Sequence, residues 1–447
     1  MTNSNDTISQ HRSSRLRKNI FASILIKSWS AIIVFLMVPL TLKCLGEYNN
    51  GVWLTISSML LWIDNLDVGL GNGLRNKLAI YLAHDEIQRA RSLISSAYAM
   101  LIYIIIPTML ILLLFIVISD NYQLLNIEPS MVENLDMILI VMVILICTTF
   151  ILKLIGNFYM GVQLPAISNL LIAFGQTFAL AGTYLVYISG SHSLLHIAIV
   201  NTISPLIVYL LAFPYTFYYK FPHLRPTISL INIQEAKSVV KVGIQFFIIQ
   251  VSGIILFATS NILISKLFSP ALVTPYQIAY RYFSIMLVIF TVICMPYWNA
   301  TTDAYEQGDM EWIQNATKKL RIMTIGIGIC LIVMIIFSNV IYTLWIGKDV
   351  KIDTQMNIAV ATYIFILIYS MRYSYFLNGI GTLRLQLFFT ATAAIIFIPL
   401  AYYTTLYFHS IIWFLAVMCM VNIPGLIVNR MQFIKLINGK ASGIWQK

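Results

Sequence analysis

Long runs of apolar residues alternate with short polar segments along almost the whole chain. Twelve runs are long enough to cross a bilayer, because a helix needs about 20 apolar residues to span a hydrocarbon core of about 30 Å. Backbone polar groups in lipid must be satisfied within their own segment, so each run is predicted to be a helix. The predicted spans are Ile20–Lys43, Val52–Asn72, Leu93–Ile118, Leu135–Met160, Pro165–Ser189, Leu194–Tyr219, Val242–Ser265, Leu272–Asn299, Leu320–Ile346, Met356–Asn378, Leu385–Tyr407 and Ile411–Ile434.

The composition excludes an ordinary soluble domain. Hydrophobic residues make up 59% of the chain and charged residues only 10%, which is typical of an integral membrane protein. The segments between the spans are too short to fold as a nucleotide-binding domain, and no G-x-x-x-x-G-K-[ST] phosphate loop is present. The helices themselves are therefore expected to carry the activity, without ATP hydrolysis by this chain.

The distribution of basic residues predicts the orientation. Of the 28 Lys and Arg residues, four lie deep inside spans and four lie on the predicted outer side, which leaves 20 at or beyond the inner ends of the spans (28 minus 8). The positive-inside rule then places both termini in the cytoplasm. The net charge of +11 is mostly this bias, so it does not indicate nucleic-acid binding. The four outer residues are Lys43, Lys266, Lys348 and Lys351.

The two halves of the chain resemble each other. A shift of 223 residues superposes Lys18 on Lys241, Lys43 on Lys266 and Trp53 on Tyr276 (241 minus 18, 266 minus 43 and 276 minus 53). The predicted fold is therefore an all-α integral membrane protein with about 12 transmembrane helices, in two six-helix lobes related by a parallel pseudo-two-fold repeat. We expect an N-terminal lobe over 1–220, a cytoplasmic linker over 221–241 that few apolar contacts cross, and a C-terminal lobe over 242–447.

Neither a metal site nor a disulfide is expected. The five cysteines are scattered, and most lie inside or at the ends of spans, where they pack as small apolar residues. His192 and His196 are four residues apart but have no acidic partner nearby in the sequence. We expect no cofactor and no catalytic residue.

Polar side chains recur at helical spacing on several spans, which predicts a polar cleft between the lobes. On the first span, Ser23, Lys27 and Ser30 follow Asn19 on one face. Charges inside a membrane helix cost about 2.5–3.5 kcal/mol on insertion scales, and such residues often line a cavity. The predicted substrate-binding residues are Ser23, Lys27, Ser30, Lys153, Gln250, Gln277, Arg281 and Arg372, and the predicted gating or coupling residues are Asp64, Asp67 and Arg75.

Each of these charges also has a structural interpretation. Lys27, Lys153 and Arg372 are near enough to a span end to extend to the membrane surface, and the two aspartates near the inner end of the second span can pair with Arg75. Arg281 is farther from the inner end, which favours a site role. The cationic excess matches an anionic substrate, because the guanidinium fork binds phosphate oxygens well.

Two motifs resemble those of the bacterial polysaccharide flippases, the O-antigen and capsule unit translocases of the MOP exporter superfamily. The first is Gly46-Glu47-Tyr48-Asn49-Asn50-Gly51-Val52-Trp53, followed by Asp67-Val68-Gly69-Leu70-Gly71-Asn72-Gly73-Leu74-Arg75-Asn76-Lys77. The second is Asn378-Gly379-Ile380-Gly381-Thr382-Leu383-Arg384-Leu385-Gln386. The length, the twelve spans and the two lobes agree with this resemblance.

The resemblance implies transfer of an undecaprenyl-pyrophosphate-linked oligosaccharide from the inner to the outer leaflet of the bacterial cytoplasmic membrane by alternating access. It implies membrane lipid, H⁺ or Na⁺ as a coupling ion, a polysaccharide polymerase and glycosyltransferases as partners. Two alternatives stay open. An ion-coupled exporter of another small-molecule class, such as a cationic drug, would favour acidic residues in the cleft. A membrane polymerase or ligase would need a sizeable outer loop with catalytic residues.

The predicted topology can be tested by single cysteines in a cysteine-free background. We expect a cysteine at position 126 to react with a membrane-impermeant maleimide in intact cells, because this position lies on the predicted outer side. Cysteines at 85, 230 and 308 should react only after the membrane is permeabilised. Labelling of position 230 in intact cells would contradict the orientation.

Overall fold

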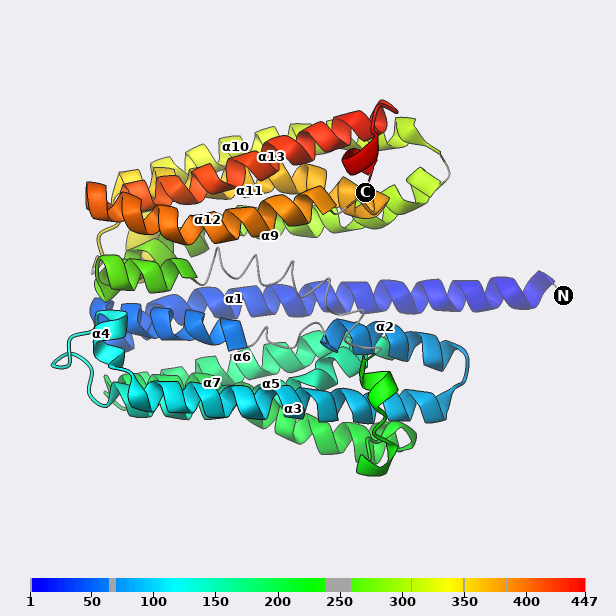
Figure 1. Cartoon of the computed structure of the whole chain (residues 1–447), viewed down its shortest axis with the longest axis horizontal. Helices are drawn as coiled ribbons and strands as arrows, with labels where there is room; N and C mark the ends of the chain where they lie inside the picture. The colour runs from blue at the N-terminus through cyan, green and yellow to red at the C-terminus, as the bar shows by residue number, and fades with distance from the viewer. Residues whose placement is uncertain are drawn as a thin grey trace. The chain divides into compact units, whose positions relative to one another are not determined.

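The computed structural model describes residues 2–63, 70–237, 259–306, 308–348, 350–382 and 384–446. All of the regular secondary structure in these ranges is helical. The chain divides into two compact units, Met1–Phe247 and Ile248–Lys447, and each unit is described by itself below. Within each unit the long helices run alongside one another (Figure 1).

The first unit is built from long helices that correspond to the apolar runs of the sequence. They pack through buried aliphatic and aromatic side chains, while many apolar side chains on the outside of α3 are exposed, as lipid-facing residues are. The proline Pro165 begins α6, where its fixed φ angle and missing N–H are tolerated. The helices are α1 Thr2–Ile63, α2 Leu70–Ala83, α3 Ile87–Ile118, α4 Asn121–Leu125, α5 Leu135–Gly161, α6 Pro165–Ile188 and α7 Leu194–Pro214, followed by η1 Tyr215–Lys220, η2 Pro222–Leu224 and η3 Ile228–Leu230.

The second unit begins, within the described residues, with a helical segment at 259–267. Side-chain caps fix the starts of three of its helices: Asp309, Asp353 and Ser410 each accept a hydrogen bond from a backbone N–H in the first turn, at 2.9, 3.3 and 3.3 Å. The following elements are α9 Pro270–Glu306, α10 Met310–Ile346, α11 Thr354–Ile380, α12 Arg384–Phe408, α13 Ile411–Ile437 and η4 Gly443–Gln446.

Ten helices of the described part of the chain are long and apolar enough to cross a membrane, against twelve predicted spans. The difference has two sources. The first predicted span and the start of the second both lie in α1, in which only Gly46 departs from helical geometry. The second span continues into residues 64–69, outside the described residues. The seventh predicted span lies mostly in residues 238–258, outside the described residues. The all-helical, multi-pass membrane fold predicted from the sequence is confirmed.

Gly46 separates the two helical parts of α1. Its backbone has φ +71° and ψ 175°, a region open almost exclusively to glycine. A Cβ at this position would meet no atom within 4 Å, so the requirement for glycine comes from the backbone angle and not from crowding. Gly46 thus lets the chain turn between two predicted membrane spans.

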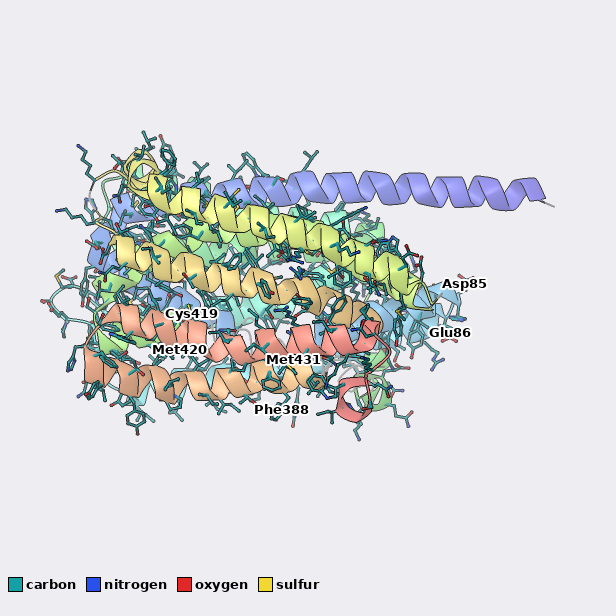
Figure 2. The ribbon with its side chains drawn as sticks, turned by 90° about the horizontal axis from the view of Figure 1, so that it is seen from above. Asp85, Glu86, Phe388, Cys419, Met420 and Met431 are labelled. Carbon is teal, nitrogen blue, oxygen red and sulfur yellow. The ribbon has the colours of Figure 1, made fainter. Side chains whose placement is uncertain are left out.

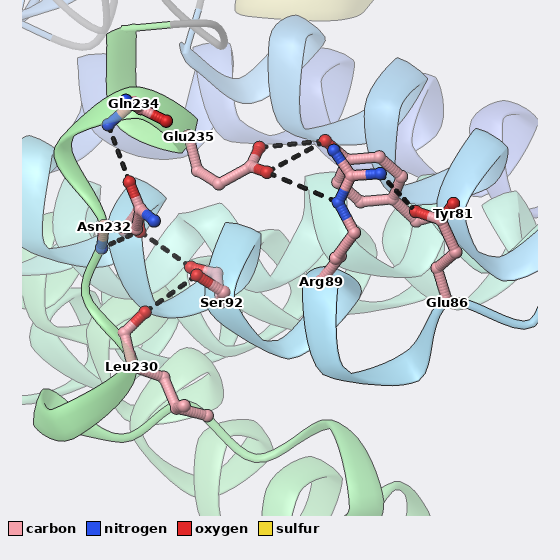
Figure 3. Close-up of polar contacts among 9 residues, drawn as sticks. Tyr81, Glu86, Arg89, Ser92, Leu230, Asn232, Gln234 and Glu235 are labelled. Carbon is pink, nitrogen blue, oxygen red and sulfur yellow. Dashed lines mark hydrogen bonds and ion pairs between the residues drawn. The ribbon is translucent and has the colours of Figure 1, made fainter.

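Residues 221–237, which we call the strap, are bonded to the start of α3. The backbone N–H groups of Thr227 and Asn232 donate to the hydroxyls of Ser95 and Ser96, at 3.0 and 2.8 Å. The Ser92 hydroxyl donates to the carbonyl of Leu230 at 2.8 Å (Figure 3). Because serines on α3 satisfy the strap's backbone groups, the strap is ordered by polar bonds.

The end of the strap is held by a charged group on α2 and α3 (Figure 3). The Tyr81 hydroxyl donates to the Glu235 carboxylate at 2.9 Å, and Arg89 lies 3.9 Å from the same carboxylate and 2.8 Å from Glu86. Burial and the neighbouring Glu235 raise the pKa of the Tyr81 phenol, so this phenol remains a donor at neutral pH. The predicted linker is therefore in large part an integral piece of the first unit.

Replacement of Gly46 by Ala should lower the unfolding temperature, because the alanine is forced into a backbone region that costs about 1–3 kcal/mol. Thermal unfolding of the purified protein in detergent measures this. Gly326→Ala on α10 is the matched control, since Gly326 is helical and a Cβ there has open space; it should leave the unfolding temperature equal or higher. Equal losses in both variants would contradict the role of the backbone angle.

The strap also predicts where the chain tolerates a break. Co-expressed fragments 1–237 and 238–447 keep the strap with the helices that bind it, so they should assemble well. Fragments 1–224 and 225–447 separate Thr227 and Asn232 covalently from Ser95 and Ser96, and should assemble less. Co-purification through a tag on one fragment measures the yield. A higher yield from the break after 224 would contradict the structural role of the strap.

Candidate functional site

The buried arginine of the second unit is Arg372 on α11, which is only 6% exposed. One of its terminal nitrogens, Nη2, donates to the hydroxyl of Tyr373. The guanidinium carbon lies 4.5 Å from the ring centroid of Tyr373 and 5.3 Å from that of Tyr369, in range of cation–π attraction. The Nε atom has no hydrogen-bond partner among the described residues, so one donor of a buried cation is unused.

Two further arginines belong to the same region. Arg321 on α10 and Arg430 on α13 belong to helices that pack against α11, and both side chains are exposed within the unit. Neither forms an ion pair among the described residues. We call these three residues the arginine cluster. Like charges repel, so the cluster favours an anion between its members.

Contacts between α11 and α13 bring Arg430 to the level of Arg372 along the two helices. The Asn429 side-chain amide donates to the hydroxyls of Ser370 and Ser374, at 3.2 and 3.1 Å. The ring of Phe433 lies 5.6 Å from that of Tyr373. These contacts determine how the two helices are aligned, and therefore which residues of α13 lie near the guanidinium.

Several buried polar atoms near the C-terminal ends of α11 and α13 and the start of α12 also have no hydrogen-bond partner among the described residues. They belong to side chains of α11, α12 and α13 and of the turn after α11, and such groups in folded proteins are usually satisfied by water or ligand. All are acceptors or a hydroxyl, so they suit water or a sugar hydroxyl better than an anion. They are Asn378 Oδ1, Thr382 Oγ1, Gln386 Oε1, Asn429 Oδ1 and Gln432 Oε1.

The other predicted site residues of the second unit lie on α9. Gln277 is buried, and its amide donates to Asn261 Oδ1 at 2.6 Å, which joins α9 to the helical segment 259–267. Arg281, one turn later, is half-buried and has an interaction partner of its own. Both residues therefore sit on the same helix face, as the sequence predicted, and Gln277 has a packing role there.

The first unit contains Ser30 and Lys153, both half-buried, on α1 and α5. Lys153 has an interaction partner. Arg75 is exposed on α2, and its carbonyl oxygen lies 3.2 Å from the position of a Cβ on Gly161, so its backbone packs on α5. The side chains of Ser23 and Lys27, and residues Asp64, Asp67 and Gln250, lie outside the described residues.

The first unit also has an apolar groove of about 340 Å³ between α1 and α6. Its lining includes Leu25, Trp29 and Phe174, and the Trp29 indole N–H donates to Thr177 Oγ1 at 3.2 Å. This surface suits a hydrocarbon chain, and the described side chains that line it include no charged group.

The sequence indicated Arg372 but not the cluster around it. Arg321 and Arg430 counted only toward the positive-inside bias, because they lie near span ends. These arginines are grouped with Arg372 by the alignment of neighbouring helices, and a single sequence does not show that alignment.

Comparison with known proteins gives a relative by sequence and several by structure. No family model matches the chain. A Salmonella typhimurium protein named "Putative O-antigen transporter" is 22% identical over 396 residues, covering 86% of each chain. An inward-facing multidrug resistance MATE family transporter of the MOP superfamily superposes with a TM-score of 0.72 at 15% identity, covering 94% of this chain and 96% of that one. A Vibrio cholerae MATE transporter superposes with a TM-score of 0.63 at 13% identity, over 97% and 99%.

These similarities confirm the fold class and the resemblance predicted from the sequence. The chain has the fold of these MATE transporters over 94% and 97% of its length. Its sequence similarity is to a protein named for O-antigen transport. It is thus a multi-pass membrane protein with a transporter fold.

Proposed function

We propose that this protein is a flippase that moves an undecaprenyl-pyrophosphate-linked oligosaccharide from the inner to the outer leaflet of the bacterial cytoplasmic membrane. The observation that carries the proposal is the similarity to the "Putative O-antigen transporter" over 86% of both chains. A match of that extent covers both units. It therefore supports a common transport function better than it supports a shared local motif alone.

The charges inside the spans support an anionic head group. Four cations lie within predicted spans: Lys27, Lys153, Arg281 and Arg372. The buried guanidinium of Arg372 has a free Nε donor among the described contacts, and such a donor binds a phosphate oxygen strongly. The expected head group carries both a diphosphate and sugars, which match cations and unpartnered polar side chains respectively.

Transport is proposed to follow alternating access. The polar head passes through a cleft lined by the predicted site residues, while the polyprenyl tail stays in lipid. Asp64 and Asp67 are proposed as the residues that couple transport to H⁺ or Na⁺, and both termini are placed in the cytoplasm. The proposed partners are the glycosyltransferases and polymerase that make and use the lipid-linked unit.

A second function, export of another small-molecule class, is favoured by the structural likeness to multidrug MATE transporters. A cationic drug would be stabilised by buried carboxylates, however, and the sequence places cations in the spans. The anionic substrate is therefore the better supported of the two. The same likeness supports a transporter over an enzyme.

Loss of the deep cations should abolish transport without loss of protein. Arg281→Ala and Lys27→Ala should reach wild-type levels in the membrane, because a buried charge is costly to insert. In a host that lacks its own flippase, both variants should fail to restore surface glycan, and lipid-linked units should accumulate on the inner face. Arg281→Lys should restore part of the activity, because a point charge replaces the planar fork.

The control is Lys351→Ala, an exposed lysine outside the helices, which should restore surface glycan fully. A stably expressed Arg281→Ala, Lys27→Ala double variant that transports normally would contradict a cationic substrate site.

A further inference from the structure

The arginine cluster results from the alignment of α10 and α11. Gly328 of α10 faces Phe365 of α11, since a Cβ on Gly328 would lie 3.0 Å from the phenylalanine ring. The two helices follow each other through a short loop and are antiparallel. Arg321 lies seven residues before Gly328, and Arg372 lies seven residues after Phe365. Seven residues are two turns, or about 10 Å, in each helix, so the two arginines are at the same level.

The third member is brought to this level by α13. The hydrogen bonds from Asn429 to Ser370 and Ser374 bracket Arg372 along α11, and Arg430 is the next residue after Asn429. It precedes Met431, which marks this part of α13 in Figure 2. Three separate helices therefore each carry one arginine at the same level of the unit.

Neutralising carboxylates are scarce around the cluster. No Asp or Glu follows Asp353 in the sequence, so α11, α12 and α13 contain none. Glu311 is in the first turn of α10, ten residues or about 15 Å before Arg321. The side chains of Asp303 and Glu306, at the end of α9, lie outside the described residues. Among the described side chains, no carboxylate compensates these three cations.

The geometry of Arg372 indicates a ligand. Its guanidinium is held by two tyrosine rings and the Tyr373 hydroxyl, which leaves Nε without a partner at 6% exposure. A buried charged donor without a partner is costly. Arg321 and Arg430 are exposed. An oxyanion bound at this level would supply the acceptor that Nε lacks and would offset the charges of the three arginines.

The depth of the cluster favours an anion that belongs to a lipid. Arg372 lies eight residues before Ile380, the end of α11, and Arg430 lies seven before Ile437, the end of α13. These separations are about 10–12 Å from the helix ends at the predicted cytoplasmic side. Basic pockets between membrane helices on that side are typical sites for lipid phosphates.

We propose that Arg321, Arg372 and Arg430 form a phosphate-binding site in the second unit, and that its ligand is the phosphate of a lipid head group in the cytoplasmic leaflet. This inference deepens the proposed function and rests on it only for the identity of the lipid as the polyprenyl carrier. The phosphate of an ordinary anionic phospholipid offers the same chemistry.

The test is lipid binding by the purified full-length protein, measured by native mass spectrometry in titrations with phosphatidylglycerol and with polyprenyl diphosphate. Wild type should retain at least one of these lipids. The double variant Arg321→Gln, Arg430→Gln should bind it at least about 100-fold less tightly, because two charge-assisted hydrogen bonds are lost. The variant Arg321→Lys, Arg430→Lys should recover most of the affinity. Arg384→Gln is the matched control, an exposed arginine at the start of α12, and should bind as wild type does.

The titrations with the two lipids distinguish the two possible sources of the phosphate. Tighter binding of polyprenyl diphosphate identifies the carrier, and tighter binding of phosphatidylglycerol identifies a leaflet phospholipid; either result supports the site. Displacement of both lipids by an equal concentration of inorganic pyrophosphate would overturn the assignment to a lipid. Unchanged lipid binding by the glutamine double variant would overturn the site itself.

Arg372→Lys provides a further readout, because lysine retains the charge but lacks the Nε donor. It should weaken diphosphate binding while the unfolding temperature without lipid stays near that of wild type. Glycan complementation is measured separately in the same variants. Complementation without lipid binding would refute the cluster and leave the flippase proposal standing, whereas lipid binding without any complementation by wild type would refute the flippase proposal alone.

Discussion

The dominant constraint on this chain is the cost of placing charge and unpaired polar groups in hydrocarbon. That cost forces its apolar runs into helices and leaves only a few cations inside them. Arg372 shows the constraint most clearly. It is buried, partly satisfied by Tyr369 and Tyr373, and retains an unused donor. A group that is expensive to bury and is not fully paired indicates a ligand more directly than any apolar surface of the molecule does.

The two units answer the same constraint in different ways. In the first unit, serines of α3 bind backbone groups of the strap, and Tyr81 and Arg89 contact the Glu235 carboxylate. In the second unit, polar side chains at the ends of α11, α12 and α13 remain without partners among the described residues. Satisfied polar groups stabilise structure, and unsatisfied ones are available to bind. Both units contain buried polar atoms without hydrogen-bond partners among the described residues, and the second unit also contains Arg372, a buried cation with an unused donor.

The sequence predicted the helical membrane fold and the boundaries of most spans, because hydropathy acts locally. The site role of Arg372 stays a prediction. It predicted a break between the first two spans but not that Gly46 alone would provide it. It treated 221–241 as a plain linker, since the hydroxyls of Ser92, Ser95 and Ser96 show no sign in the sequence of what they bind. Arg321 and Arg430 were missed for a similar reason: their proximity depends on how Gly328 meets Phe365 and how Asn429 meets Ser370. Lys27, Asp64, Asp67 and Gln250 stay predictions.

The central claim is transbilayer movement of a diphosphate-linked oligosaccharide, and reconstitution tests it most directly. Purified protein is placed in proteoliposomes with a polyprenyl diphosphate oligosaccharide, and a membrane-impermeant glycosidase or lectin reports how much of the lipid reaches the outer leaflet with time. The account predicts protein-dependent movement of this lipid, and none of a neutral glycolipid with the same sugars. Equal movement of both lipids would contradict it. So would movement in the proteoliposomes that is no faster than in empty liposomes when both carry an imposed H⁺ or Na⁺ gradient.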